Sequence, residues 1–207
     1  MMRKHIIFDM DGTLSDTAKG TMAAIKKVEK LYKLPGITIA EIKAAMGIAG
    51  FEFYRHMYPG VPKDILIHVE REVDILEDEE ISEIGEGILF SGVKEMLTVL
   101  VEKSYDLYIA STGSKKHVHT TLAAAGIENL FTGISCGEPG KIAMVGRIVA
   151  EQDRKEWIMV GDMYKDSEAA RANNILALGA GYGYLDKGDI PLFDAVLAKP
   201  MDIYGYL

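Results

Sequence analysis

The chain has 207 residues, of which 48% are hydrophobic and 26% are charged, and its formal net charge is −8 at pH 7. This length and apolar content allow a core domain of ordinary size with a small accessory domain, and they exclude a disordered chain. The excess of acidic residues argues against a nucleic-acid partner, because a nucleic-acid surface needs a basic stripe.

Cysteine usage and hydropathy bear on the compartment of the protein. The single cysteine, Cys136, excludes an intrachain disulfide and fits a reducing cytoplasm. No stretch approaches the roughly twenty apolar residues of a membrane span, and the apolar run near the N-terminus is too short for a secretory signal. We therefore expect a soluble, cytoplasmic protein with no membrane partner, as a monomer or a homodimer.

The first predicted element is a buried strand over residues 5–8, which form a short apolar run. It leads into Asp9 and Asp11, and Gly12 breaks it. In near-extended chain, residues two apart point to the same side, so both carboxylates can face one ligand. A hard divalent cation such as Mg²⁺ relieves their mutual repulsion and prefers oxygen ligands. A capped turn without a metal is the alternative, because Asp-x-Asp-Gly-Thr is also good turn chemistry.

The next region, residues 16–87, has helical periodicity and no convincing strand. Its two apolar stripes consist of Met22, Ile25, Val28 and Tyr32, and of Leu66, Val69, Val73 and Leu76. An all-helical insert within a fold of alternating strands and helices indicates a lid. We expect a small all-helical cap domain at residues 16–87, inserted after the first strand, and a core made of residues 1–15 and 88–207.

The remaining chain alternates between strands and helices. Apolar runs at residues 107–110, 157–160 and 175–178 predict strands, and an amphipathic helix begins at Lys141. The apolar positions of that helix are Ile142, Val145, Ile148 and Val149. Alternating elements of this kind imply a parallel sheet with crossover helices. The predicted fold class is α/β, with a Rossmann-like parallel-sheet core and helices on both of its faces.

Polar residues follow three of the predicted strands. Asp9 follows the first, Ser111 and Thr112 follow the second, and Asp162 follows the strand at residues 157–160, with Asp166 four residues further on. Open parallel sheets bind ligands at the carboxyl ends of their strands. We therefore expect these side chains to meet at one edge of the sheet.

Together these residues resemble the motifs of the haloacid dehalogenase superfamily of phosphohydrolases. Residues 9–17, Asp-Met-Asp-Gly-Thr-Leu-Ser-Asp-Thr, look like its first motif, and residues 161–166 are similar to its acidic fourth motif. Ser111 matches the hydroxyl residue of the second motif and Lys141 the lysine of the third. Lys115 and Lys116 compete with Lys141, because they directly follow the second motif. The resemblance spans about residues 5–185 and points to the helical-cap branch that contains phosphoglycolate phosphatase-like enzymes.

The resemblance implies a role for each acidic residue. Asp9 is expected to be the nucleophile that forms an aspartyl-phosphate, and Asp11 the general acid and later the general base. Mg²⁺ is expected to bind the Asp9 carboxylate, the Asp11 backbone carbonyl and the Asp162 carboxylate. Asp166 is expected not to bind the cation itself but to orient Asp162 or a water bound to the cation. The alternative is structural, because Asp162 and Asp166 also suit the start of a helix.

The resemblance also implies how the substrate is bound. Ser111 and the backbone N–H of Thr112 are expected to bind a phosphoryl oxygen, and Lys141 to neutralise charge between nucleophile and phosphate. In the predicted cap, Arg55 is the candidate for a second anionic group of the substrate, although a solvated helix arginine is the alternative. His117 and His119 lie two apart on a predicted helix, so they point to different sides and cannot share a metal.

The sequence thus predicts a Mg²⁺-dependent phosphatase that hydrolyses a small soluble phosphate monoester through an aspartyl-phosphate intermediate. The alternatives are a phosphomutase similar to β-phosphoglucomutase and a non-catalytic sensor of a phosphorylated ligand. Ile142 follows Lys141 where many relatives of the phosphoglycolate branch have proline, and residues 111–113 are Ser-Thr-Gly where they often have Thr-Asn-Lys. These departures leave the identity of the ester open.

Overall fold

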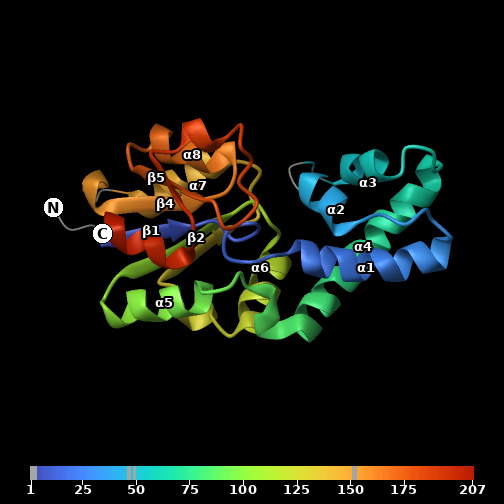
Figure 1. Cartoon of the computed structure of the whole chain (residues 1–207), viewed down its shortest axis with the longest axis horizontal. Coiled ribbons are helices and arrows are strands. Elements are labelled where there is room, and N and C mark those ends of the chain that lie inside the picture. The colour runs from blue at the N-terminus through green and yellow to red at the C-terminus, as the bar shows by residue number, and fades with distance from the viewer. Residues whose placement is uncertain (1–3, 46–47, 49, 151–152) are drawn as a thin grey trace. The chain divides into compact units, whose positions relative to one another are not determined.

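A computed structural model describes residues 4–45, 48, 50–150 and 153–207 (Figure 1). Contacts along the chain divide it into two compact units, Met1–Asp16 with Leu89–Leu207, and Thr17–Ile88. The first unit carries a β-sheet with surrounding helices, and the described residues of the second are helical or irregular.

The sheet of the α/β unit has six strands, all parallel, in the order β3-β2-β1-β4-β5-β6. Its strands are β1 (His5–Phe8), β2 (Asp106–Ser111), β3 (Gly133–Cys136), β4 (Trp157–Gly161), β5 (Leu176–Ala180) and β6 (Ala195–Leu197). Phe8 of β1 pairs with Ile109 of β2 and Val160 of β4, so the three central strands end at the same level. The predicted α/β fold with a parallel sheet is confirmed.

Helices cover the sheet on two sides. The α-helices of this unit are α5 (Val93–Glu102), α6 (Lys115–Ala125), α7 (Lys141–Val149) and α8 (Tyr164–Ala172), and its 3₁₀ turns are η2 (Glu128–Leu130), η3 (Arg154–Glu156), η4 (Ile190–Leu192) and η5 (Pro200–Tyr206). In Figure 1, α7 and α8 lie on one face of the strands and α5 on the other. Ile7 and Met159 are buried against α7 and α8. Because strand residues alternate in direction, Ile6 and Phe8 fill the opposite layer, where they are fully buried.

Two parts of this unit differ from the sequence-based expectation. The strands β3 and β6 were not predicted, because they are short, lie at or near the sheet edges and are mostly half-buried. In α7, Val145 and Val149 are buried as predicted, but Ile142 is 44% exposed and Lys141 is buried instead. An apolar stripe cannot reveal that the first buried residue of this helix is a lysine.

The second unit is built from α1 (Ala18–Tyr32), α2 (Ile39–Ala45), α3 (Phe51–Met57), α4 (Lys63–Ile84) and η1 (Gly85–Ile88). The helices α1 and α4 pack along each other, with Ile25 of α1 and Val73 of α4 almost fully buried. The buried Glu29 carboxylate accepts the Ile37 N–H at 2.7 Å and the Tyr58 hydroxyl at 3.2 Å. Among the described residues of both units, no helix combines the length and the apolar character needed to cross a membrane.

Candidate active site

The loop after β1 turns sharply at the edge of the sheet. The Asp9 N–H donates to the Val160 carbonyl at 2.9 Å, which continues the β1–β4 pairing by one residue. Gly12 then adopts φ +81°, in the left-handed region, where a side chain is strained. A Cβ on Gly12 would also collide with the Asp162 carboxylate. Glycine at this position therefore lets the loop close against the end of β4.

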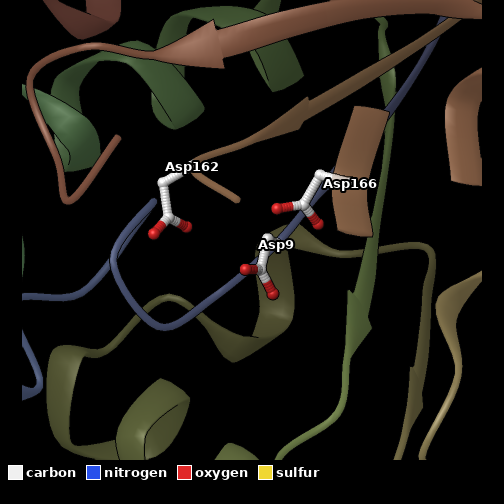
Figure 2. Close-up of side chains that lie close together, drawn as sticks. All are labelled: Asp9, Asp162 and Asp166. Atoms are coloured by element: carbon white, nitrogen blue, oxygen red, sulfur yellow. The ribbon is translucent and has the colours of Figure 1, made fainter. Parts of the chain in front are cut away.

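Three buried carboxylates gather at this edge, as Figure 2 shows. Asp9 follows β1, Asp162 follows β4, and Asp166 lies in the first turn of α8. Each has an oxygen within 4.8 Å of the others, and their exposed fractions are 5%, 2% and 0%. Because β1 and β4 end at the same level, Asp9 lies next to Asp162 and Asp166, which are more than 150 residues later in the sequence.

Lys141 is the cation that contacts this cluster. Its Nζ lies 2.6 Å from Asp9 Oδ1 and 2.5 Å from Asp166 Oδ1, and its side chain is 5% exposed. Lys115 and Lys116, the competing lysines, are exposed at the start of α6. Asp166 also accepts the Met163 N–H at 3.0 Å through Oδ2. Both Asp166 oxygens are thus engaged, one by Lys141 and the other by Met163.

Burial dominates the electrostatics of the cluster. Desolvation and the neighbouring charge of Asp166 raise the pKa of Asp9 from 3.8 to about 7, because together they outweigh the Lys141 ammonium, which lowers it. Desolvation and the charge of Asp9 raise the pKa of Asp162 well above its usual range, although Thr13 Oγ1 donates to Asp162 Oδ1 at 2.8 Å. Burial alone would lower the pKa of Lys141, but the Asp166 and Asp9 carboxylates raise it.

The cluster fits a hard divalent cation. If all four groups ionise, three carboxylates face one ammonium, which leaves two negative charges buried without a counter-charge. Mg²⁺ prefers such oxygen ligands and retains waters, so it does not need a complete protein cage. Since Asp166 is engaged by Lys141 and Met163, Asp9 and Asp162 are the carboxylates best suited to bind it.

The residues expected to bind phosphate lie at the end of β2. Ser111 is 1% exposed, and its Oγ accepts the Gly113 N–H at 3.0 Å. Thr112 is exposed, and Ser114 caps α6. The hydroxyl of Ser111 is therefore fixed by the turn that leads into α6, at the same sheet edge as Asp9.

Sequence reasoning missed a contact of Asp11. The Asp11 Oδ1 lies 3.0 Å from Nε2 of His117, in the first turn of α6. His119, the other histidine of this helix, pairs instead with Glu128 at 2.6 Å. The two histidines do point to different sides, but His117 faces the candidate site. No signal in the sequence could have found this contact, because it depends on how α6 docks beside the loop after β1.

A second missed feature is the loop at residues 181–184. The Tyr184 N–H donates to the Gly12 carbonyl at 3.1 Å, and the Tyr184 hydroxyl donates to Asp16 Oδ1 at 2.5 Å. The Tyr182 hydroxyl is buried and has no hydrogen-bond partner among the described residues. The loop at residues 181–184 therefore braces the loop after β1.

Arg55 lies on α3 in the helical unit. Its guanidinium is mostly exposed and pairs with Glu52 at 2.5 Å, three residues earlier on the same helix. The other sequence-predicted site residues belong to the α/β unit.

Comparisons with known proteins agree with this geometry. The family model for haloacid dehalogenase-like hydrolases matches residues 6–180. The phosphoglycolate phosphatase of Synechococcus elongatus is 30% identical over 124 residues, which are 56% of this chain and 57% of that protein. The phosphoglycolate phosphatase of Agrobacterium fabrum is 25% identical over 192 residues, 87% of this chain and 81% of that protein.

Among solved structures, a predicted phosphoglycolate phosphatase from Haemophilus somnus superposes with a TM-score of 0.83. It is 23% identical, and the match covers 100% of this chain and 98% of that one. This likeness shows the shared fold. With the family match spanning most of its length, the chain belongs to the haloacid dehalogenase-like hydrolase family.

Proposed function

We propose that this protein is a Mg²⁺-dependent phosphatase that hydrolyses a small phosphate monoester, of the kind represented by phosphoglycolate. The observation that carries the proposal is the placement of Asp9: it is buried at the end of the central strand, paired with Lys141 and next to Asp162. Asp11 lies two residues further along the same loop. The names of the relatives support the same reaction class.

The reaction divides into two steps at these side chains. A carboxylate oxygen of Asp9 attacks phosphorus, the bond from phosphorus to the leaving oxygen breaks, and Asp11 gives its proton to that oxygen. Asp11, now ionised, then takes a proton from a water that attacks the aspartyl-phosphate. The acyl-phosphate bond breaks at phosphorus, which restores Asp9 and releases inorganic phosphate. The net reaction is that the ester and water give the alcohol and inorganic phosphate, with all atoms and protons accounted for.

The cation would be held by the Asp9 carboxylate, the backbone carbonyl of Asp11 and the Asp162 carboxylate. When bound, Mg²⁺ supplies positive charge that polarises the phosphoryl group and keeps the carboxylates ionised. Lys141 holds one oxygen of Asp9, and Asp166 holds Lys141 in place.

Binding of the phosphoryl group would involve the Ser111 hydroxyl and the Thr112 N–H, near the N-terminus of α6. The helical unit, Thr17–Ile88, would act as the cap, with Arg55 as its candidate for a second anionic group. A cytoplasmic location is part of this proposal, and the single cysteine supports it.

The test is phosphate release from 2-phosphoglycolate, glycerol 3-phosphate, glucose 6-phosphate, adenosine monophosphate and p-nitrophenyl phosphate, with Mg²⁺ and with EDTA. We expect Mg²⁺-dependent release that Asp9→Asn abolishes. Asp64→Asn, which changes an exposed aspartate of the helical unit, is the matched control and should leave the rate unchanged. Absence of release from every ester by folded wild-type protein would overturn the proposal. Isomerisation that depends on an added sugar bisphosphate would identify a mutase instead.

A further inference from the structure

We propose that His117 is a positioning residue that fixes the carboxylate of Asp11 for proton transfer. The inference rests on the proposed function, because it takes Asp11 as the general acid and base of ester hydrolysis. It concerns a residue that lies outside the four motifs that the sequence displays.

The contact joins two segments that are 106 residues apart in sequence. Nε2 of His117 lies 3.0 Å from Oδ1 of Asp11, within the range of a good hydrogen bond. The Asp11 side chain is 26% exposed and that of His117 is 17% exposed. The buried Asp9 is held by Lys141, and the more exposed carboxylate of Asp11 likewise needs a specific partner to keep one rotamer.

His117 is itself held firmly. It is the third residue of α6, and its N–H donates to the Oγ of Ser114, which caps the helix, at 3.2 Å. Because this turn of the helix is capped, the backbone of His117 has a defined position relative to the end of β2. The helix thus carries the imidazole ring to the more exposed Asp11, where Nε2 lies 3.0 Å from Oδ1.

Gly113 lies close to the side chains of both Asp11 and His117. A Cβ on Gly113 would lie 3.2 Å from the Oγ of Ser111, 3.3 Å from Cδ2 of His117 and 3.4 Å from Oδ2 of Asp11. The side chains of Ser111, His117 and Asp11 therefore pack around the bare backbone of one glycine. The Asp11 carboxylate is bounded by Gly113 on its Oδ2 side and by His117 at Oδ1.

The hydrogen bond serves both halves of the reaction. With Asp11 ionised, Oδ1 accepts from Nε2–H; with Oδ2 protonated, Oδ1 is the carbonyl oxygen and still accepts. The plane of the carboxylate is the same in both states. Oδ2 can then deliver a proton to the leaving oxygen and later accept one from water without a change of rotamer.

The test exploits the leaving group. Departure of an alkoxide from an alkyl phosphate depends strongly on a general acid, whereas departure of the weakly basic p-nitrophenolate does not. We measure kcat/KM with Mg²⁺ for wild type, His117→Ala and His117→Gln, on p-nitrophenyl phosphate and on the alkyl phosphate of the panel that wild type cleaves best. This constant includes the steps up to formation of the aspartyl-phosphate, so slow breakdown of the intermediate does not mask the effect.

We expect His117→Ala to lower kcat/KM on the alkyl ester by at least about tenfold more than on the aryl ester, a part of the roughly 10² to 10⁴ that general acid catalysis contributes. His117→Gln keeps a donor at Nε2 and should restore most of the loss. His119→Ala is the matched control, because His119 lies on the same helix and pairs with Glu128, and it should change neither constant.

Equal losses on the two esters would overturn the inference, because they would indicate a general distortion of the site, and so would unchanged constants. If His117→Ala fails to fold, His117→Asn replaces it, since its shorter amide does not reach Asp11. A wild-type protein that cleaves neither ester overturns the proposed function and the inference with it. If wild type is active and the His117 variants keep its ratio of kcat/KM between the alkyl and the aryl ester, the inference alone is overturned.

Discussion

The ammonium of Lys141, at the first residue of α7, lies 2.5 Å from an oxygen of Asp166, at the third residue of α8. The same ammonium lies 2.6 Å from Asp9. One buried cation therefore bridges the candidate nucleophile and a carboxylate whose other oxygen accepts the Met163 N–H. Asp166 acts on Asp9 through Lys141, and the position of the lysine depends on how two neighbouring helices pack.

Removing this cation should destabilise the protein. Lys141→Met leaves the buried carboxylates without the ammonium, and loss of one partner from a buried ion pair costs about 3 to 5 kcal/mol. We expect the free energy of unfolding in urea with EDTA to fall by about 3 kcal/mol at pH 8. The loss should be smaller at pH 5, where a protonated Asp9 needs no counter-charge.

Lys115→Met is the matched control, since Lys115 is also the first residue of a helix but is exposed. Its effect on the free energy of unfolding should stay within about 0.5 kcal/mol. If the two variants had the same free energy of unfolding, the buried Lys141 would contribute no more to stability than an exposed lysine does.

The raised pKa of Asp9 predicts a pH-dependent stability of the metal-free protein. Between pH 3.8 and about pH 7 the folded chain keeps a proton on Asp9 that the unfolded chain releases. Its contribution to stability is therefore fully present below pH 3.8 and is lost as the pH rises through 7. The free energy of unfolding of wild type minus that of Asp9→Asn should fall with pH across this window, at up to about 1.4 kcal/mol per pH unit. Urea titrations in EDTA from pH 4 to pH 8 measure this difference.

The same shift predicts the pH dependence of cation binding. Metal binding to these carboxylates displaces protons, so Mg²⁺ should raise Tm more at pH 8 than at pH 5.5. Asp162→Asn should remove most of the Mg²⁺-induced rise, and Asp64→Asn should leave it unchanged. A rise in Tm that did not vary with pH would contradict the assignment of these carboxylates as ligands.

Much of the site could be predicted from the sequence, because its strand runs and acidic residues are local signals. The run at residues 5–8 marked β1, and it placed Asp9 directly after the end of that strand. The position of Asp162 after β4 followed from another apolar run. Parallel pairing then brought these loops to one edge, as the alternation of strands and helices implied.

The remaining features depend on contacts between distant segments. Nothing in the spacing of His117 distinguishes a histidine facing Asp11 from one facing solvent, and only the docking of α6 decides it. The inward face of α7 was predicted to include Ile142, but packing against α8 and the sheet turns Lys141 inward. The strands β3 and β6 have four and three residues, which is too short for a periodic pattern to stand out in the sequence.

The loop at residues 181–184 should be intolerant of a side chain at Gly183. A Cβ there would overlap the carbonyl oxygen of Gly12, the group that accepts the Tyr184 N–H. We expect Gly183→Ala to displace the loop after β1, to lower the free energy of unfolding by about 1 to 3 kcal/mol and to reduce phosphatase activity at least about tenfold. Gly205→Ala is the control, because a Cβ at Gly205 meets no atom within 4 Å. Full activity of Gly183→Ala would show that this loop does not brace the site.

Arg55 allows a separate test of substrate choice by the helical unit. Its guanidinium is mostly exposed and pairs with Glu52, so Arg55→Ala should change the free energy of unfolding by less than about 1 kcal/mol. If Arg55 binds a second anionic group, the variant should raise KM for 2-phosphoglycolate several-fold and leave KM for p-nitrophenyl phosphate unchanged, because only the former carries a carboxylate. Glu52→Ala serves as the control: it breaks the same ion pair and keeps the cation, so it should not raise KM for 2-phosphoglycolate. Equal KM values for Arg55→Ala and wild type on both esters would leave Arg55 as a surface residue of α3 with no part in binding.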